Sequence, residues 1–577
     1  MDGNLKVIFG LVGGLSLFLF GMNSMSDALQ KAAGEKMKKI LGFLTKNPVM
    51  GALAGALVTA VLQSSSATTV MVIGFVSAGL MSLPQAISVI FGANIGTTMT
   101  AQLMAFKITD YIYPIIFIGF MLNFACKKER VKNIGMVIFS FGLLFEGIEI
   151  MGSVMKPLAS SPVFIELMSK VKDLPVLGVL LGMIMTVVVQ SSSATIAVLQ
   201  NFASQAGPDG VTSVIGLAGA IPILLGDNIG TTITALLASI GQSKNAKRTA
   251  IAHSVFNITG SIVFLFLIPV LTGFVQFISP KGAEIDVISR QIANAHTTFN
   301  VVCTLVWLPL IPVMVKIVTF IISGDDRAAL REYEPQFIDN NLISQPAAAM
   351  CLVSKELGRL ADCAMDMMDN LKSYVVNRNN ISSRTREYAD KVNIVKTLQD
   401  NIASYITKML SSGNLTENQA EQVSGLLYVS NNIGRIADRC GEIEGICNKM
   451  ADDKTAFSKD ANEDLEDCIS MAQELYYDAV TSVKLGNTEL ATKVSKEKNK
   501  IRKAEKQFNK AHLNRVKKKE CSESLTADYS GILYSIDRLA DNCVAIAEET
   551  LDNISFIQFE NNDEAAAAIE ASGGDQV

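Results

Sequence analysis

The polar hexapeptide QSSSAT occurs twice in this chain, at residues 63–68 and 190–195, and both copies interrupt apolar stretches. Each is followed by a second polar segment, GANIGTTMT at 92–100 and GDNIGTTIT at 226–234. Serine runs beside a helix break can present N–H groups and hydroxyls to an anion, while hydroxyl and carboxamide oxygens suit small, hard cations. The candidate binding residues are Gln63, Ser64, Ser65, Ser66, Thr68, Asn94, Thr97 and Thr98 in the first copy and Gln190, Ser191, Ser192, Ser193, Thr195, Asn228, Thr231 and Thr232 in the second.

The scarcity of charge around these segments limits what they bind. No charged residue lies within 47–106, and 174–243 contains only Asp209 and Asp227. An anion in a low-dielectric environment needs its charge offset, and no Lys or Arg is available here. A co-bound cation would meet that need. The residues alone therefore predict cation-coupled transport of a small anion.

Three further ionisable residues in the apolar half are candidates for a functional role. One is an aspartate and two are histidines. Asp227 occupies the position that holds Ala93 in the first copy. A carboxylate in a membrane segment marks a functional site by default, which favours a cation site at Asp227. The alternative is that Asp227 is a solvated or capping residue. His253 and His296 share the sequence H-x-x-F-N. For both we expect a hydrogen-bonded structural role rather than proton transfer.

The composition divides the chain into two halves. Residues 1–322 are rich in Gly, Ala and large apolar residues, with several runs long enough to span a bilayer as helices, whereas residues 323–577 are charged throughout. We predict an all-α, multi-pass protein of the cell membrane with a soluble, cytoplasmic C-terminal half. No G-x-S-x-G elbow and no phosphate-binding P-loop occurs, so we expect neither a serine hydrolase nor an ATP-driven pump, and no enzyme.

The membrane half contains two copies of one unit. Residues spaced four apart lie on one helix face, and their glycines allow close packing. Downstream of the hexapeptides the offset between the copies grows from 127 to 134 residues, which places a seven-residue insertion near 205–210. The units are predicted at 1–126 and 134–300. The matched positions are Gly51, Gly55, Thr59 and Gln63 in the first unit and Gly178, Gly182, Thr186 and Gln190 in the second.

Basic residues indicate that the two units face opposite ways. The segments 31–46, 127–132 and 244–248 are strongly basic, and the other connecting segments mix signs. If these segments are loops, the positive-inside rule places the basic ones in the cytoplasm. The segment 31–46 then lies inside while its counterpart, 156–173, lies outside. Inverted repeats of this kind are typical of secondary transporters.

A single QSSSAT would be explained by ordinary packing between membrane helices, but two copies in inverted units favour a binding site. This arrangement, with NIGTT after each copy, resembles the type II sodium/phosphate cotransporter family over about residues 5–320. AHSVFN (252–257) and AHTTFN (295–300) are similar to that family's H-x-x-F-N helices.

The resemblance implies sodium-coupled symport of inorganic phosphate, with the QSSS and NIGTT residues lining one shared site near the middle of the membrane. It implies phosphate, sodium ions and the lipid bilayer as partners, without an organic cofactor, a resident metal or nucleic acid. Sodium-coupled transport of another small oxyanion or a carboxylate stays open, as does a membrane-anchored phosphate sensor.

The soluble half is predicted to form six amphipathic helices in an antiparallel bundle. Their spans are 347–377, 383–411, 416–451, 460–485, 488–516 and 523–556. Three similar segments, LGRLADCAMDM, IGRIADRCGEI and IDRLADNCVAI, resemble the PhoU family, whose bundles carry metal-binding motifs of the form E/D-x-x-x-D. Only Asp537 and Asp541 keep both acids here, because Gly358 and Gly434 replace the first acid elsewhere. We expect a regulatory or dimerising bundle rather than a multinuclear metal site.

These arguments divide the chain into five segments. A homo-oligomer is compatible with this arrangement. The predicted segments are membrane repeat 1 at 1–133, membrane repeat 2 with a final transmembrane helix at 134–323, a linker at 324–346, the PhoU-like bundle at 347–558 and a disordered tail at 559–577.

Overall fold

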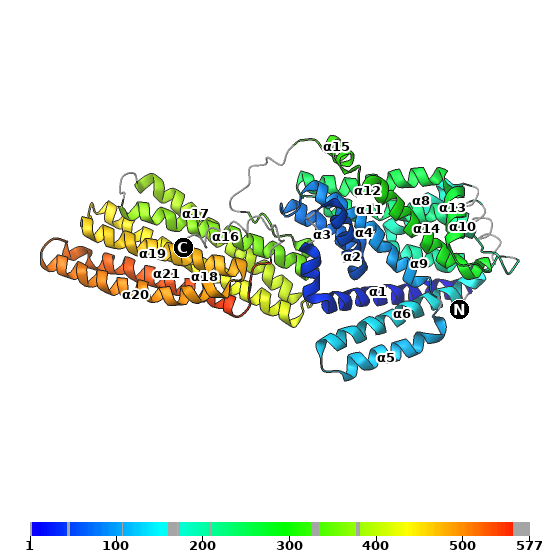
Figure 1. The fold of residues 1–577 in the computed structure, drawn as a ribbon, viewed down its shortest axis with the longest axis horizontal. Coiled ribbons are helices and arrows are strands. Elements are labelled where there is room, and N and C mark those ends of the chain that lie inside the picture. Colours follow the sequence, from blue (N-terminus) through cyan, green and yellow to red (C-terminus); the bar gives the residue numbers. More distant parts are fainter. Residues whose placement is uncertain are drawn as a thin grey trace, which may run out of the picture. The chain divides into compact units, whose positions relative to one another are not determined.

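The protein is all-helical in the computed structural model apart from one isolated β-bridge, Ala206–Ser213, among the described residues. The chain forms two compact units, Met1–Asp326 and Arg327–Val577, and each has its own buried core. Figure 1 shows both. The structure describes residues 3–42, 47–106, 108–159, 170, 174–207, 209–324, 334–376 and 381–557.

The first unit repeats one order of helices. A long helix comes first, two short helices follow, and a further helix carries the NIGTT segment. Repeat 1 consists of α1 (Gly3–Gly42), α2 (Pro48–Leu62), α3 (Ser65–Ser77), α4 (Leu83–Met104) and α5 (Ile112–Ala125). Repeat 2 consists of α6 (Glu129–Ala159), α8 (Pro175–Val189), α9 (Ser192–Ala203), α10 (Gly216–Gly230) and α11 (Thr232–Ala238). The sequence then continues through α12 (Lys244–Phe266), α13 (Ile268–Ile278), α14 (Glu284–Trp307) and α15 (Ile311–Ile321).

Glycines set the packing of the short helices in both repeats, as their spacing predicted. Gly55 of α2 lies against the Val89 carbonyl of α4, and Gly182 of α8 lies against the Ile223 carbonyl of α10. A Cβ atom at either glycine would overlap the facing backbone. Because the two contacts sit at equivalent positions, the same sequence feature builds the same helix pair twice.

Five segments of the described chain are candidates for crossing a membrane. Four are single spans, at Lys6–Ala32, Glu129–Met155, Gly216–Ala238 and Lys244–Phe266, and the fifth is the pair α14 and α15, which is bent by 88°. The helices α1 and α6, which include the first two spans, run side by side (Figure 1). These helices agree with the prediction of a multi-pass membrane protein.

The basic segment 31–46 differs from its predicted loop, because α1 continues as a helix to Gly42. The residues of this segment that lie in α1, KAAGEKMKKILG (31–42), are mostly strong helix formers, so the helix does not stop where the apolar run stops. The basic segment 244–248 likewise forms the first turns of α12. The counterpart 156–173 lies mostly outside the described residues.

The predicted seven-residue insertion is confirmed between α9 and α10. Twelve residues, 204–215, connect these helices, whereas five residues, 78–82, connect α3 to α4. The longer connection folds on itself, with the Gly207 amide donating to the Thr212 carbonyl at 2.8 Å. Repeat 2 also differs by a break at Thr231 between α10 and α11, whereas α4 runs unbroken through its NIGTT segment.

The second unit contains the six predicted amphipathic helices within a few residues of their predicted ends. Chain after the last helix returns to the bundle, where the Phe556 amide donates to the Val483 carbonyl and the Ile557 amide to the Ser354 hydroxyl. The predicted tail at 559–577 lies outside the described residues. The helices are α16 (Pro346–Val376), α17 (Ile381–Ser411), α18 (Glu417–Asp452), α19 (Lys459–Leu485), α20 (Thr488–Lys517) and α21 (Thr526–Leu551).

Candidate functional site

Each QSSSAT segment breaks a helix at the same residue. Gln63 ends α2 with φ of 52°, and Gln190 ends α8 with φ of 54°, both in the left-handed region. The next residue caps the following helix. The Ser64 hydroxyl accepts from the Ala67 amide at 3.1 Å and the Ser191 hydroxyl from the Ala194 amide at 3.2 Å. The polar hexapeptide thus supplies a turn and an N-cap.

The chain folds back on itself at each break. The hydroxyl oxygens of Thr59 and Thr68 lie 2.8 Å apart, and those of Thr186 and Thr195 lie 3.0 Å apart. Residues nine apart in a straight helix would be separated by about 13 Å, so each pair of short helices forms a hairpin. The helices α2 and α8 have 15 residues, or about 22 Å, which is shorter than the roughly 30 Å core of a bilayer.

The two repeats exchange contacts around these hairpins. The Thr234 hydroxyl of α11 lies 3.1 Å from the Ser66 hydroxyl of α3. From repeat 2 to repeat 1, the Gln200 side-chain Nε2 atom of α9 donates to the Ala101 carbonyl of α4 at 3.1 Å. Each hairpin therefore packs against the NIGTT-bearing helix of the other repeat. Both hairpins thus contribute to the interface between the two repeats.

Asp227 is joined to the hairpin of its own repeat by hydroxyl groups. Its Oδ1 atom accepts from Thr186 at 2.6 Å, Thr186 lies 3.0 Å from Thr195, and Thr195 donates to the Ser191 carbonyl at 3.3 Å. Asp227 is fully buried, and its Oδ2 atom has no hydrogen-bond partner among the described residues. Ala93 holds this place in repeat 1. A buried carboxylate oxygen without a donor suits a cation.

The histidines of the two H-x-x-F-N helices hold the asparagines of the NIGTT segments. His253 Nε2 on α12 lies 3.0 Å from Asn94 Oδ1, and His296 Nε2 on α14 lies 3.3 Å from Asn228 Oδ1. A carboxamide oxygen only accepts hydrogen bonds, so Nε2 carries the proton in both rings. This geometry is consistent with the expected structural role of the histidines. The two hydrogen bonds orient the carboxamides of Asn94 and Asn228, which are candidate binding residues.

The hydroxyls of the site divide into two groups by what they do with their hydrogen. The Ser64 and Ser191 hydroxyls accept helix-capping bonds, which leaves their hydrogens available for donation. In contrast, Thr98 and Thr232 donate to the carbonyls of Ile95 and Ile229, each at 2.8 Å, and Thr231 donates to its own helix in the same way. Only lone pairs remain on these threonine oxygens.

The two glutamines differ in their surroundings. Gln63 is 6% exposed and accepts from Thr100 at 3.1 Å, whereas Gln190 is exposed. Thr234, the counterpart of Thr100, bonds Ser66 of the other repeat and leaves Gln190 without an equivalent contact. The serines Ser64, Ser66, Ser191 and Ser192 are partly buried. The remaining predicted site residues are buried, namely Ser65, Thr68, Asn94, Thr97, Thr98, Ser193, Thr195, Asp227, Asn228, Thr231 and Thr232.

Comparison with known families also finds a duplicated membrane half and a separate C-terminal half, with the boundary between the two membrane matches inside α6. Residues 17–153 and 154–294 each match the family described as Na+/Pi-cotransporter, and residues 357–444 and 465–550 match the PhoU domain. The chain belongs to the Na+/Pi-cotransporter family. The two matches confirm that the membrane unit of this cotransporter-family protein is duplicated, and neither matched family is an enzyme family.

Individual relatives cover different parts of the chain. An uncharacterized Bacillus subtilis protein, YqeW, is 35% identical over 267 residues, which are 46% of this chain and 84% of the relative. The Escherichia coli K12 protein named "Putative inorganic phosphate export protein YjbB" is 22% identical over 551 residues, 94% of this chain and 97% of the relative. Rat sodium-dependent phosphate transport protein 2A is 38% identical over 97 residues, 16% of this chain and 15% of the relative. No solved structure matches.

Several residues around the candidate site were not among those predicted. Thr186 marks the repeat in the sequence, but its bond to Asp227 depends on how α8 packs on α10. The carboxamides of Asn257 and Asn300 each retain a buried oxygen without a partner in the described part of the chain. They are the last residues of the H-x-x-F-N segments, and that repetition was the signal that could have identified them.

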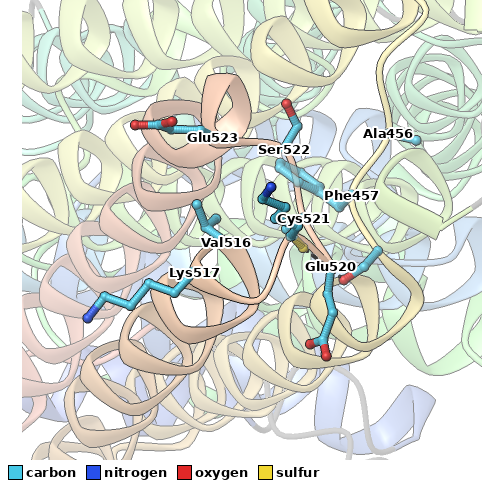
Figure 2. Close-up of a pocket in the computed structure, with 10 residues that line it drawn as sticks. Ala456, Phe457, Val516, Lys517, Glu520, Cys521, Ser522 and Glu523 are labelled. Atoms are coloured by element: carbon cyan, nitrogen blue, oxygen red, sulfur yellow. Dashed lines mark hydrogen bonds between the residues drawn. The ribbon is translucent and has the colours of Figure 1, made fainter.

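The PhoU unit contains a hollow of different character. A cavity of about 490 Å³ lies where the ends of α18 and α20 meet the following helices, and Figure 2 shows it. The charged side chains of Lys517, Glu520 and Glu523 extend away from one another. Cys521 donates to the Ser458 hydroxyl at 3.0 Å at its wall. The charged side chains that line this cavity do not converge on one point.

Proposed function

We propose that the protein transports inorganic phosphate in symport with sodium, with the two QSSS hairpins forming the two halves of one central site. The observation that carries this proposal is the contact between the repeats at Ser66 and Thr234, inside segments that contain no Lys or Arg. A phosphate bound there takes its counter-charge from co-bound cations, because residues 47–106 and 174–243 contain no Lys or Arg.

The hydroxyl geometry supports a division of labour within this site. Ser64 and Ser191 have hydrogens to donate, so they are suited to phosphate oxygens, together with the N–H groups at the starts of α3 and α9. Thr98, Thr231 and Thr232 have only lone pairs left, so they are suited to sodium, which binds hard oxygen ligands. The remaining predicted serines, threonines and asparagines complete the lining in this proposal.

Asp227 is the residue whose burial and hydrogen bonding best suit a cation site. It is the one acidic residue of the hairpin segments that is buried, and its Oδ2 atom has no donor in the described structure. A sodium ion on Asp227 would act on the QSSS turn of repeat 2 through Thr186 and Thr195. Repeat 1 has the same threonine pair without the carboxylate, so this cation site would exist once per chain.

The direction of transport in the cell is a separate question. One relative that spans nearly the whole chain is named for phosphate export, whereas a relative that shares a shorter segment is named for sodium-dependent phosphate transport. A symporter carries its cargo in the direction set by the combined gradients. The proposed coupling is therefore compatible with uptake or export.

Phosphate flux into proteoliposomes tests the proposal, with an inward sodium gradient compared with an equal potassium gradient. We expect accumulation with sodium only, and loss of that flux in Gln63→Ala and Gln190→Ala. The matched control is Gln276→Ala, an exposed glutamine on α13, which should leave flux unchanged. Phosphate binding without flux would favour the sensor, and flux of another oxyanion or a carboxylate in place of phosphate would correct the cargo. Normal flux in both hairpin variants would contradict the site.

A further inference from the structure

The PhoU unit keeps one complete acidic pair, on α21. Asp537 and Asp541 are one helical turn apart, so their carboxylates lie on the same face of α21. In the PhoU family such pairs are associated with metal ions. Whether a metal fits here depends on what already occupies the space between the two carboxylates.

A lysine from the neighbouring helix occupies that space. Lys498 of α20 is 7% exposed, its ammonium bonds Asp541 Oδ1, and it lies 3.9 Å from Asp537 Oδ1. A buried ammonium without a partner would be costly, so the pair of carboxylates and Lys498 stabilise one another. The ammonium stands where a metal ion would have to bind both acids.

Two arginines add to the positive charge at this position. Arg502 lies 3.8 Å from Asp537 and 3.7 Å from Asp541, and Arg538 bonds Asp541 Oδ2 at 3.2 Å. Three cations therefore surround two carboxylates. A divalent cation would be repelled by this excess and would find both Asp541 oxygens already hydrogen-bonded, although Asp537 Oδ1 has no hydrogen-bond partner among the described residues.

The first half of the PhoU unit is closed to a metal in another way. Gly434 on α18 stands at the position equivalent to Asp537, and the Gln399 carboxamide of α17 lies directly over it. Gln399 in turn donates to Asn431 at 3.2 Å. No group of three or more His, Cys, Asp or Glu residues suited to a metal ion occurs in the part of the chain that the structure describes.

We propose that Lys498 is a built-in cation that replaces a metal ion at the acidic motif of the second PhoU half. The α20–α21 contact is then held by Lys498 and its two aspartates, and the unit keeps its fold without any divalent metal. The residues present do not fit the metal site that the family implies, and Lys498 is the reason.

The full-length protein tests this by metal analysis and thermal unfolding. Wild type, purified after growth with iron, manganese and zinc, should contain no stoichiometric metal, and a chelator should leave its unfolding temperature unchanged. Lys498→Ala should lower that temperature and make it respond to added Mn²⁺. Combining it with Asp541→Asn should abolish the Mn²⁺ response.

Two further variants separate this role from general damage. Lys498→Arg keeps the charge and should stay insensitive to Mn²⁺, and Lys503→Ala, an exposed lysine on the same helix, should behave like wild type. Stoichiometric metal in wild type that is lost in Asp537→Asn would overturn the proposal. So would a folded Lys498→Ala protein whose stability ignores Mn²⁺.

Discussion

At the residue scale, one substitution, Asp227 in place of Ala93, distinguishes the two repeats around the proposed site. Thr186 and Thr195 reproduce the hydroxyl pair of Thr59 and Thr68, but only the second pair meets a carboxylate. Since Asp227 is buried with one oxygen unpaired in the described structure, it is the residue at which cation binding and the hairpin turn are most directly linked.

Replacing Asp227 by Asn should reduce sodium-driven phosphate flux by about ten- to hundredfold, the usual cost of disturbing an ion site. The amide keeps the shape and the Thr186 contact but loses the charge that holds the cation. Asp209→Asn is the matched control, because this second acid of the block lies in the exposed α9–α10 connection. Unchanged sodium dependence in Asp227→Asn would remove Asp227 from the cation site.

The serine and threonine hydroxyls should affect different ligands. Ser64→Ala or Ser191→Ala removes a donor to a charged anion, and we expect the phosphate KM to rise roughly tenfold with little change in sodium half-saturation. Thr98→Val or Thr232→Val removes a lone-pair ligand and should mainly raise the sodium concentration for half-maximal flux. Titrating each ligand at saturating levels of the other distinguishes the two outcomes. Equal effects on both ligands in all four variants would contradict the division.

At the element scale, the hairpins depend on close contact between backbones. The Gly92 position of α4 faces the Ala52 carbonyl of α2, and Gly226 of α10 faces the Val179 carbonyl of α8. Added volume at such a position must push a hairpin away from the helix that carries NIGTT. The glycine pattern is therefore tied to the shape of the site as well as to the stability of the unit.

Gly92→Ala and Gly226→Ala should each destabilise the membrane unit by about 1–3 kcal/mol, the usual cost of overpacking. Thermal unfolding of the detergent-solubilised protein measures this. Gly13→Ala on α1 is the control, since no atom lies within 4 Å of its added Cβ, and better helix propensity should make it neutral or slightly stabilising. A neutral Gly92→Ala would show that the hairpin contact can relax.

A buried histidine should make the PhoU unit sensitive to acid. His512 of α20 stacks on Tyr529, and neither ring nitrogen has a hydrogen-bond partner among the described residues. Burial lowers its pKa below the ordinary value, nearby Arg515 adds to this, and Asp464 opposes it. The unfolded chain therefore binds the proton more readily, so the free energy of unfolding should fall as pH drops below about 6.5.

Hydrogen exchange of α20 and α21 between pH 7.5 and 5.5, corrected for the intrinsic rate, measures this loss. His512→Phe keeps the aromatic stack and should remove most of the pH dependence. Asn514→His adds an exposed histidine to the same helix and should leave it unchanged. An equally steep pH profile in His512→Phe would assign the effect to other groups.

At the scale of the whole molecule, the chain forms two compact units, and the proposed transport site lies within one of them. Every proposed site residue lies in Met1–Asp326, and the PhoU unit has its own buried core. A chain ending after residue 326 should therefore still carry phosphate with sodium in proteoliposomes, with any change confined to rate or its regulation. Loss of phosphate binding in a truncated protein that unfolds like the intact membrane unit would contradict this separation.

The sequence was informative wherever a feature repeats. Periodicity predicted the six helices of the PhoU unit, and offsets predicted the duplication of the membrane unit and the insertion between α9 and α10, but not the hairpins. It could not predict contacts that arise only from packing, such as His253 with Asn94 or Lys498 between two aspartates. The prediction of a loop at 31–46 was also wrong at the end of α1. The apolar run stops before this segment, but its residues have high helix propensity and extend the helix to Gly42. The predicted segment boundaries and binding residues stay predictions.

The unequal surroundings of Gln63 and Gln190 have a consequence for how cargo moves. In the proposed transport cycle, two turns built from the same six residues would each take up the environment that the other now has. Exchanging those environments would cover the open turn and open the covered one, which is alternating access by role reversal. Asp227 is on one side only, so it makes the two end states unequal in energy. Cation occupancy, and not a separate gate, would then choose between them.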